Sequence, residues 1–436
     1  MNRKGAGMKK GRNWVWIMGI VLVLLLFETS LIHGEEMRDL LSKFHPYITV
    51  SEEYNNNINL SHTNKIDDFI TTVNAGLKFS AVEEKKYGID LDFAGGFVFY
   101  ARHHNFDYFS PSGSLNAWYA ATPRLTFRVR DYLIRDDAAR EPVYTANALP
   151  NQYLLSTERT HAIYIRNVVE PSVDYQFAKD GLISVLYRNN IYRNQNPLYE
   201  DSMENTINPK LTYWFDIKNG LSLDYYLTSG TYQRSPDQLA QGVTPRYTYR
   251  FNPRVSIFGE YHFEWQDFKS PGVDYYVHNP SLGIQYQFSP TLTGTAQVGY
   301  FWQIPEQGSG AGGPSFNLSL TKSAQRTTYS LSFHGGYTED YFTAQNRGFV
   351  KTYMVYGTIS HKLTDKMTVG VNGSMQRAIY GNDQKDWIWG ISGNASYALL
   401  KWLSLSLQVG YIGDHSNISN LDYSQYRGIF SVTATF

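Results

Sequence analysis

The chain of 436 residues contains no cysteine. This absence excludes a disulfide framework, a cysteine-based zinc cluster, a thiol nucleophile and a lipid anchor on cysteine. Long apolar runs are almost as scarce. Residues 15–27 form the only one, and it is shorter than the ~20 residues that a transmembrane helix needs. No sign of charge is in excess, since 39 Lys/Arg balance 39 Asp/Glu. Without a basic tail or stripe, no nucleic-acid partner is expected.

Motifs of catalysis and cofactor binding are also absent. The sequence has no Gly-x-Ser-x-Gly elbow, no His-Glu-x-x-His and no phosphate-binding glycine loop. The pair His103-His104 lacks a neighbouring carboxylate and a third ligand at metal spacing, so we interpret it as two loop histidines. We therefore expect no enzymatic activity, no catalytic residues, no cofactor and no metal site.

The N-terminal segment has the pattern of a secretory signal. Several Lys/Arg within residues 3–12 precede the apolar run at 15–27, and a polar stretch with small residues continues to Gly34. An uncleaved anchor is the alternative. We predict a signal peptide over residues 1–34, a short periplasmic segment over 35–44 and a single domain over 45–436. Without residues 1–34 the chain is mildly acidic.

Alternation of apolar and polar residues dominates the chain after residue 45. From Tyr87 to Phe99 the apolar residues recur at every second position, with Asp90 and Asp92 between them. The chain is 16% aromatic, with 35 Tyr, yet its mean hydropathy is −0.39. Such a combination is typical of a transmembrane β-barrel, in which only half of the strand residues contact lipid.

Connections of two lengths separate the alternating segments. Short turns, for example around residues 84–88, 218–220 and 364–366, alternate with longer loops such as 136–157. The long loop can either fold inward as a constriction or lie on the surface. We predict an all-β fold, a transmembrane antiparallel up-and-down β-barrel of about 18–20 strands in a Gram-negative type outer membrane, with the short turns periplasmic.

A repeat of about 35 residues underlies this alternation. Each copy begins with proline and ends with an aromatic residue or leucine near a short turn, and the prolines are Pro171, Pro209, Pro245, Pro280 and Pro314. The proline and the apolar residues share one parity, so we predict that they face lipid and that the terminal residues form an aromatic girdle. Because proline donates no ladder hydrogen bond, we expect missing or bulged ladder bonds there.

The last segment, residues 426–436, is a further alternating strand. Phe430, Val432 and Phe436 share its apolar face, opposite Arg427 and Ser431. This pattern resembles the C-terminal assembly signal of outer-membrane barrels. We therefore expect outer-membrane lipid and the barrel assembly machinery as partners.

The segment from Pro46 to Ile58, the Pro-x-apolar-x-Tyr-x-Phe repeats and Phe436 together resemble the putative beta-barrel porin 2 family. The resemblance covers residues 40–436. It implies an outer-membrane barrel and, because members are often associated with exopolysaccharide or capsule export, a polysaccharide pathway with polysaccharide export proteins as partners. It brings no catalytic motif.

Inward-facing positions supply the candidates for lining the lumen. They are the basic residues Arg128, Arg130, Arg166, Arg188, Lys210, Arg246 and Arg250, the acidic residues Asp90, Asp92, Glu170 and Asp174, and the aromatic residues Tyr132, Tyr164 and Trp214. One interpretation is a selectivity lining that attracts anionic sugar units. The other is that opposite charges pair across strands and support the wall. The aromatic residues either stack on sugar rings or fill space.

These observations leave several functional hypotheses. The first is a porin-like channel that passes or assists the export of an extracellular polysaccharide, and a general solute-diffusion porin is its alternative. A structural or adhesive barrel without a transport role fits the same pattern. A gated transporter would need a folded N-terminal plug, for which about ten residues between Gly34 and the first strand leave no room.

Overall fold

The computed structural model describes residues 41–137, 161–197, 199–341 and 348–436. The chain divides into two compact units, Met1–His45 and Pro46–Phe436. The predicted signal peptide, most of the periplasmic segment and most of the long loop at 136–157 lie outside the described residues. Within the described ranges, no helix is long and apolar enough to cross a membrane.

One antiparallel sheet of 20 strands accounts for most of the second unit. The strands are β1 (Phe44–Asn55), β2 (Asp68–Glu83), β3 (Tyr87–Tyr100), β4 (Tyr108–Thr122), β5 (Leu125–Asp136), β6 (Tyr164–Ala178), β7 (Gly181–Asn194), β8 (Ser202–Trp214), β9 (Asn219–Tyr232), β10 (Gln238–Asn252), β11 (Val255–Phe268), β12 (Tyr275–Ser289), β13 (Leu292–Pro305), β14 (Ala311–Ser323), β15 (Thr327–Asp340), β16 (Gly348–Lys362), β17 (Met367–Tyr380), β18 (Lys385–Leu400), β19 (Leu403–Ser416) and β20 (Tyr423–Thr435). A short 3-10 helix, η2 (His104–Phe106), precedes β4.

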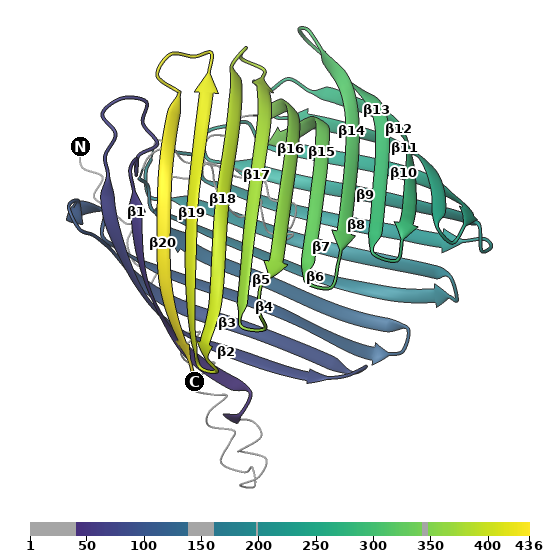
Figure 1. Ribbon diagram of the computed structural model, residues 1–436. Coiled ribbons are helices and arrows are strands. Elements are labelled where there is room, and N and C mark those ends of the chain that lie inside the picture. Colours follow the sequence, from purple (N-terminus) through teal and green to yellow (C-terminus); the bar gives the residue numbers. More distant parts are fainter. Residues whose placement is uncertain (1–40, 138–160, 198, 342–347) are drawn as a thin grey trace, which may run out of the picture. The chain divides into compact units, whose positions relative to one another are not determined.

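The sheet closes into a barrel (Figure 1). Each strand pairs with the next along the chain, and β20 pairs with β1 in a register that runs from Tyr47 opposite Thr435 to Asn55 opposite Arg427. Closure pairs the backbone donors and acceptors of what would otherwise be edge strands, which a lipid environment requires. The predicted antiparallel barrel of 18–20 strands is confirmed.

Connections at the two ends of the barrel differ in length, as the turn residues predicted. At one end, consecutive strands are joined by two to four residues, and at the other by four to 27. The first is called the short-turn end and the second the long-loop end.

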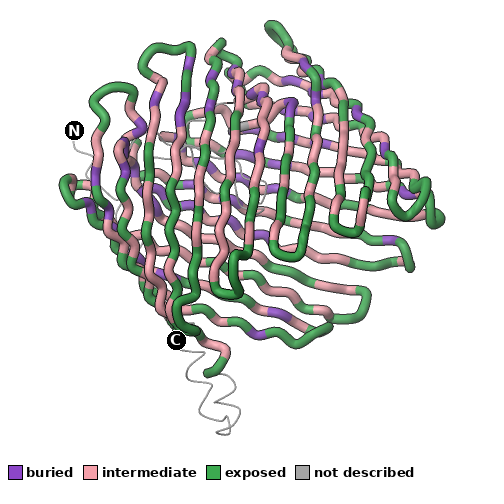
Figure 2. Tube along the Cα trace, in the orientation of Figure 1, coloured by how far each residue is buried: buried purple, intermediate pink, exposed green. Residues whose placement is uncertain are grey.

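Period-two alternation determines which face each residue occupies. On β3, Phe93 and Phe97 are 45% and 55% exposed on the outer face, whereas Ala94 and Val98 point inward and are buried. The same alternation of exposed and less exposed residues runs along the strands in Figure 2. The outer face is apolar because it contacts lipid, and the inner face is free to carry polar groups.

Prolines of the repeat interrupt the ladder in a regular way. Between β8 and β9 the pairing passes from Ile207 opposite Leu227 directly to Lys210 opposite Asp224, so Pro209 has no partner on β9. It retains a partner on β7. The same skip occurs at Pro171, Pro245 and Pro280.

This skip follows from the missing N–H of proline, which would point toward the following strand. At Pro209 the free carbonyl of Tyr225 is satisfied instead by the side-chain amide of Asn208, at 2.6 Å. The expected loss of ladder bonds at this level is confirmed.

Aromatic residues at the ends of the repeats gather beside the short turns. Ring centroids lie 5.1 Å apart for Tyr213 and Phe215, and 4.3 Å apart for Tyr286 and Phe288. The ring of Phe215 is 61% exposed. These pairs form the predicted aromatic girdle at the short-turn end of the outer face.

The predicted assembly residues lie on β20. Phe430 is exposed on the outer face, opposite Leu407 on β19, and Val432 follows it on the same face. Phe436 stacks on Trp402 with ring centroids 6.4 Å apart. The backbone N–H of Phe436 donates to the carbonyl of Pro46 at 2.8 Å, which helps to join the last strand to the first.

Candidate functional site

Charged residues of the inner face form lateral rows across neighbouring strands. Asp90 on β3 lies opposite Asn116 on β4, which lies opposite Arg130 on β5, which lies opposite Glu170 on β6. Residues that are directly opposite share a face. The candidate lining residues therefore all face inward, and the rows of opposite charge result from the register.

Glu170 lies at the centre of the row. One carboxylate oxygen is 3.0 Å from a guanidinium nitrogen of Arg130, and the other accepts a hydrogen bond from Nε of Arg188 at 2.8 Å. Arg188 also lies 3.8 Å from Glu204. The carboxylate is buried, so both arginines shield it from water.

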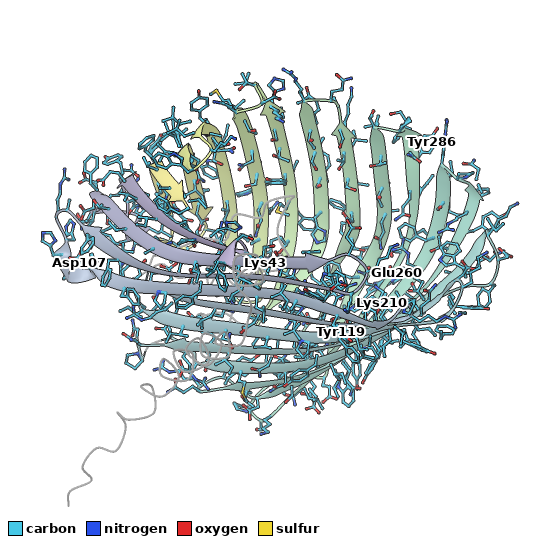
Figure 3. All side chains as sticks on the ribbon, turned by 90° about the horizontal axis from the view of Figure 1, so that it is seen from below. Lys43, Asp107, Tyr119, Lys210, Glu260 and Tyr286 are labelled. Carbon is cyan, nitrogen blue, oxygen red and sulfur yellow. The ribbon has the colours of Figure 1, made fainter. Side chains whose placement is uncertain are left out.

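Further pairs continue this arrangement around the wall. Nε of Arg128 is 3.0 Å from Asp174, whose other oxygen accepts a hydrogen bond from the hydroxyl of Ser184. Lys210 lies 3.3 Å from Asp224, and Arg246 lies 3.7 Å from Glu260. Lys210 and Glu260 lie on the inner side of the wall and Tyr286 on the outer side (Figure 3).

In each of these pairs the cation is the more exposed partner. The side chain of Arg130 is 42% exposed and that of Glu170 is 3% exposed; the corresponding values are 51% and 28% for Arg128 and Asp174. The acids lie close to the wall and the longer basic side chains extend over them. The arrangement therefore has features of both interpretations: opposite charges pair across strands, and the basic ends still face the lumen.

Two acidic candidates have hydroxyl partners. Asp90 accepts a hydrogen bond from the hydroxyl of Ser80 at 2.6 Å. Asp92 accepts one from the hydroxyl of Tyr47 at 2.8 Å and lies 3.8 Å from Lys78.

One aromatic candidate, Trp214, and the inward-facing Phe258 stack on arginines. The guanidinium of Arg250 lies 3.4 Å from the ring centroid of Trp214, and that of Arg246 lies 3.6 Å from the ring of Phe258. Such stacking holds a guanidinium flat against the wall and leaves its edge available. Tyr132 faces inward on β5.

Two candidates are buried rather than exposed to the lumen. Arg166 is 1% exposed, and its Nε donates to Asn190 at 3.1 Å. Tyr164 is 0% exposed and packs against Tyr192 with ring centroids 5.5 Å apart. Parity predicted their inward direction, but both side chains are almost fully buried, so they do not form part of an accessible lining.

The upper part of β15 lies inside the wall, a feature that the sequence analysis missed. Pairing between β14 and β15 stops at Phe316 opposite Gly335, and Gly336 has a φ of 150°. Beyond Gly336, the ring of Tyr337 lies 5.1 Å from that of Phe301, which faces inward on β13. The strand therefore separates from β14 but stays paired with β16 as far as Asp340 opposite Gly348, so the end of this strand pair turns toward the inner face. A Gly-Gly pair within an alternating segment was the available signal, since glycine tolerates this backbone conformation.

Polar contacts fix this inner segment to the wall three to four strands away. The hydroxyl of Tyr275 on β12 donates to Glu339 at 2.6 Å, and the amide of Gln266 on β11 donates to the other oxygen at 2.6 Å. The same amide donates to Glu264, and the ring of Tyr341 lies 5.3 Å from that of Phe268. We call residues 337–341 the inner segment; they lie against inward-facing residues of the wall at the long-loop end.

The histidine pair contacts two carboxylates, which the sequence pattern did not predict. Nδ1 of His103 lies 2.7 Å from Asp68, a carboxylate that is distant in sequence, and His104 lies 3.5 Å from Asp107. The statement that no carboxylate is near was therefore wrong, because β2 and β3 pair and bring Asp68 to this loop. Across the described part of the chain, no group of three or more His, Asp or Glu is placed to hold a metal.

Comparison with known proteins identifies a family that the chain matches. Residues 224–436 match the model of the family described as putative beta-barrel porin 2. Because this is a family of porins, which are channels, the expectation that the chain is not an enzyme is confirmed. No curated protein sequence matches the chain.

Solved structures of similar fold include siderophore receptors. The siderophore receptor PirA from Pseudomonas aeruginosa shares 10% identity, with 90% of this chain and 80% of that chain covered and a TM-score of 0.51. PirA from Acinetobacter baumannii shares 8% identity with the same coverage and a TM-score of 0.50. A variant of the ferric enterobactin receptor PfeA from Pseudomonas aeruginosa shares 9% identity, again with that coverage, and a TM-score of 0.50. At these identities the likeness shows the fold of an outer-membrane barrel and nothing more.

Proposed function

Because residues 224–436 belong to the putative beta-barrel porin 2 family, we propose that the chain is a porin-like channel that passes, or assists the export of, an extracellular polysaccharide. The observation that carries the proposal is the greater exposure of the cation in each ion pair of the lumen wall. Fixed positive charge on a low-dielectric wall concentrates anions within about a Debye length, ~8 Å at physiological salt. Acidic sugar units are anions of this kind.

The proposal includes an orientation and a set of partners. The short-turn end faces the periplasm and the long-loop end faces outward, as in other outer-membrane barrels. The exposed apolar outer face contacts outer-membrane lipid. The barrel assembly machinery inserts the chain, and polysaccharide export proteins deliver the polymer to the short-turn end.

The first test is ion selectivity of purified protein in a planar bilayer. Replacing Arg128, Arg130 and Arg188 together by Gln should shift the preference toward cations. The shift should fade in about 1 M salt, where the Debye length falls to ~3 Å. Arg124→Gln is the matched control, because Arg124 lies in the short turn between β4 and β5, away from the inner rows.

Two outcomes of the bilayer test would contradict parts of the proposal, the first the channel and the second the role of the arginines. Well-folded protein that does not conduct would indicate a closed or structural barrel. An unchanged selectivity in the triple variant would show that these arginines only neutralise Glu170 and Asp174.

A second test identifies the cargo. A strain that lacks the protein should lose surface polysaccharide, and the wild-type chain should restore it. Conductance together with unchanged surface polymer would favour a general solute-diffusion porin instead.

A further inference from the structure

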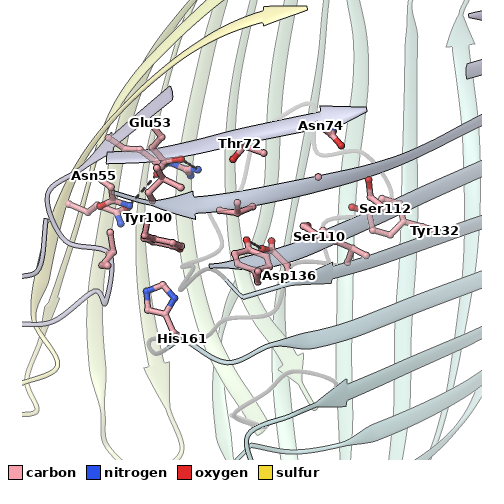
Figure 4. Close-up of a pocket in the computed structure, with 18 residues that line it drawn as sticks. Glu53, Asn55, Thr72, Asn74, Tyr100, Ser110, Ser112, Tyr132, Asp136 and His161 are labelled. Carbon is pink, nitrogen blue, oxygen red and sulfur yellow. Dashed lines mark hydrogen bonds and ion pairs between the residues drawn. The ribbon is translucent and has the colours of Figure 1, made fainter. Parts of the chain in front are cut away.

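A cavity of about 320 Å³ lies on the inner face at the long-loop end, where β20 meets β1. Its lining comes from β1 to β5, from β20, from Ile58 in the connection after β1 and from His161 before β6. Figure 4 shows Tyr100, Asp136 and His161 converging on it from β3, from β5 and from the segment that leads into β6. Its volume is at the lower end of the range for small-molecule sites, which is roughly 300–1,000 Å³.

His161 lines the cavity with its hydrogen-bonding capacity unused. Its side chain is 7% exposed, and neither ring nitrogen has a hydrogen-bond partner among the described residues. The nearest carboxylate oxygen, of Asp137, is 3.8 Å from Nδ1, which is too far for a hydrogen bond. One face of the imidazole stacks on Phe106 with centroids 4.1 Å apart. A buried imidazole without partners costs free energy, so its two nitrogens are available to a ligand that both donates and accepts.

Asn74 is the second lining residue with an unsatisfied atom. Its Oδ1 is buried and accepts no hydrogen bond. Gly96 lies directly beside it on β3, and a Cβ at that position would lie 3.2 Å from the same oxygen. The absence of a side chain at Gly96 leaves space next to this acceptor.

Charged groups of the cavity are already neutralised or held by other partners. Glu53 and Arg427 form a bidentate pair with distances of 2.6 and 2.7 Å, across the strands that close the barrel. Asp136 accepts a hydrogen bond from the hydroxyl of Tyr108 at 2.6 Å. With two carboxylates and one guanidinium, the lining has an excess of negative charge, which disfavours an anionic ligand.

The remaining lining combines hydroxyl and amide groups with apolar side chains. Ile58, Ile70 and Val98 form one cluster with Tyr100. Thr72, Ser110 and Ser112 supply hydroxyl groups on the neighbouring strands. A ring that carries several hydroxyl groups and has apolar C–H faces complements such a surface.

We propose that this cavity is a binding subsite for one or two uncharged sugar units. The hydroxyl groups of the sugar would donate to Oδ1 of Asn74 and exchange hydrogen bonds with both nitrogens of His161, while its C–H face would contact Tyr100 and the isoleucines. The subsite is separate from the basic rows on β5 to β8, so neutral and acidic units of one polymer can use different parts of the wall. The inference rests on the proposed passage of saccharide.

Other ligand classes fit the cavity less well. A phosphate or a uronic acid would need a cation whose charge is not already neutralised, and Arg427 forms a bidentate pair with Glu53 through Nε and one terminal nitrogen. A metal ion is not favoured, since no suitable group of ligands exists within the described residues. A lipid chain would leave His161 and Asn74 unsatisfied.

The test measures sugar binding to the folded protein directly. The full chain in a detergent without a sugar head group is titrated with maltose, cellobiose and lactose, and with glucuronic acid, by saturation-transfer NMR. Ser112→Phe fills the cavity, and His161→Phe keeps the ring on Phe106 while removing both nitrogens. Ser114→Phe is the matched control, because Ser114 is the next inward residue on β4 and lies outside the cavity lining. Heat-modifiable migration in gels verifies that each variant folds.

At least one neutral disaccharide should bind the wild type, and its affinity should fall about tenfold in Ser112→Phe and severalfold in His161→Phe. The Ser114→Phe control should bind as the wild type does. Absence of binding to folded wild type, equal binding in all variants, or a preference for glucuronic acid would overturn the proposal. Sugar binding without bilayer conductance would retain the subsite and reject the channel, whereas conductance without sugar binding would do the reverse.

Discussion

Glu170 connects two basic side chains at one point of the wall. Its two oxygens contact Arg130 at 3.0 Å and Arg188 at 2.8 Å, and its own side chain is almost fully buried. A buried carboxylate is stable only when it is paired, and here both partners contribute. The arginines are partly exposed, so solvent screens their side of the interaction.

Glu170→Gln should therefore change both stability and selectivity. Removing the charge leaves Arg130 and Arg188 with less compensation, so the bilayer preference should move toward anions. Loss of the charge-assisted bonds should lower the free energy of unfolding by about 1–3 kcal/mol. Reversal potentials in a salt gradient and the temperature of the heat-modifiability transition measure the two effects.

Glu260→Gln is the control for this prediction. Its partner Arg246 is 3.7 Å away and also stacks on Phe258, so the same charge change should cost less stability. Equal losses of stability in the two variants would contradict the central role of Glu170.

Some polar residues on the outer face form hydrogen bonds with one another. Asp131 is opposite the outward Val169 and accepts a hydrogen bond from the amide of Asn167 at 2.7 Å. Nearby, Asn189 donates to Asn205 at 2.8 Å. A polar group that faces lipid needs such a partner. Alternation alone could not predict these pairs, because they depend on the register between strands.

At the scale of the strand pair, each of several long loops has an aspartate that binds the end of the preceding strand. Each one immediately precedes a strand and accepts a hydrogen bond from a backbone N–H at or near the end of the strand before it. These loop aspartates are Asp107, Asp201, Asp237, Asp274 and Asp422. The bond satisfies a donor that the ladder no longer reaches, which ends each strand pair in a defined way.

Asp237 gives this arrangement a pH dependence. Hydrogen bonds from Lys269 and from the backbone N–H of Tyr232 hold its pKa below the usual value. A lowered folded-state pKa contributes stability that is present above the unfolded pKa of ~3.9 and is lost as pH falls through the folded value.

In Asp237→Asn the loss of thermal stability between about pH 5 and pH 3 should be shallower than in the wild type, because one titrating group is gone. Asp365→Asn is the control, since Asp365 lies in a short turn where its side chain is 91% exposed. Melting curves over this range are the measurement. Identical pH profiles for wild type and Asp237→Asn would contradict the prediction.

The inner segment on β15 predicts a conductance effect. Tyr275 and Gln266 hold Glu339 against the wall, and Tyr341 packs on Phe268. The double change Glu339→Ala and Tyr341→Ala should release the segment, widen the lumen and raise single-channel conductance severalfold, because conductance rises with the open cross-section.

Glu306→Ala controls for the loss of one carboxylate, because Glu306 is exposed in the loop after β13. Unchanged conductance in the double variant would show that the inner segment does not limit the current.

At the scale of the whole molecule, local sequence patterns predicted the barrel but not its interior. The faces of β3, the short turns and the interrupted ladder at Pro209 all follow from period-two alternation and proline chemistry, which act within one strand pair. The aromatic girdle follows in the same way.

Features that depend on distant contacts could not be predicted. The cavity joins Glu53 to Arg427, residues at opposite ends of the barrel sequence that meet only on closure. The inner segment keeps the period-two alternation along the chain. A bend at Gly336, however, places the side chains that alternation assigns to the outer face against the inner wall. The burial of Arg166 likewise could not be predicted, because alternation encodes the direction of a side chain and not its exposure.

The orientation of the barrel in the membrane gives the last prediction. The chain has no cysteine, so a single introduced cysteine can be labelled without background. Lys218 and Thr364 are exposed in connections at the short-turn end, and Ser309 and Asn382 are exposed at the long-loop end. If the short turns are periplasmic, a membrane-impermeant maleimide added to intact cells should label Ser309→Cys and Asn382→Cys but not Lys218→Cys or Thr364→Cys. Disruption of the outer membrane should then make all four sites reactive, which shows that the unlabelled pair was enclosed rather than folded away. Labelling of Lys218→Cys and Thr364→Cys in intact cells would reverse the orientation, and with it the end from which a polymer would enter.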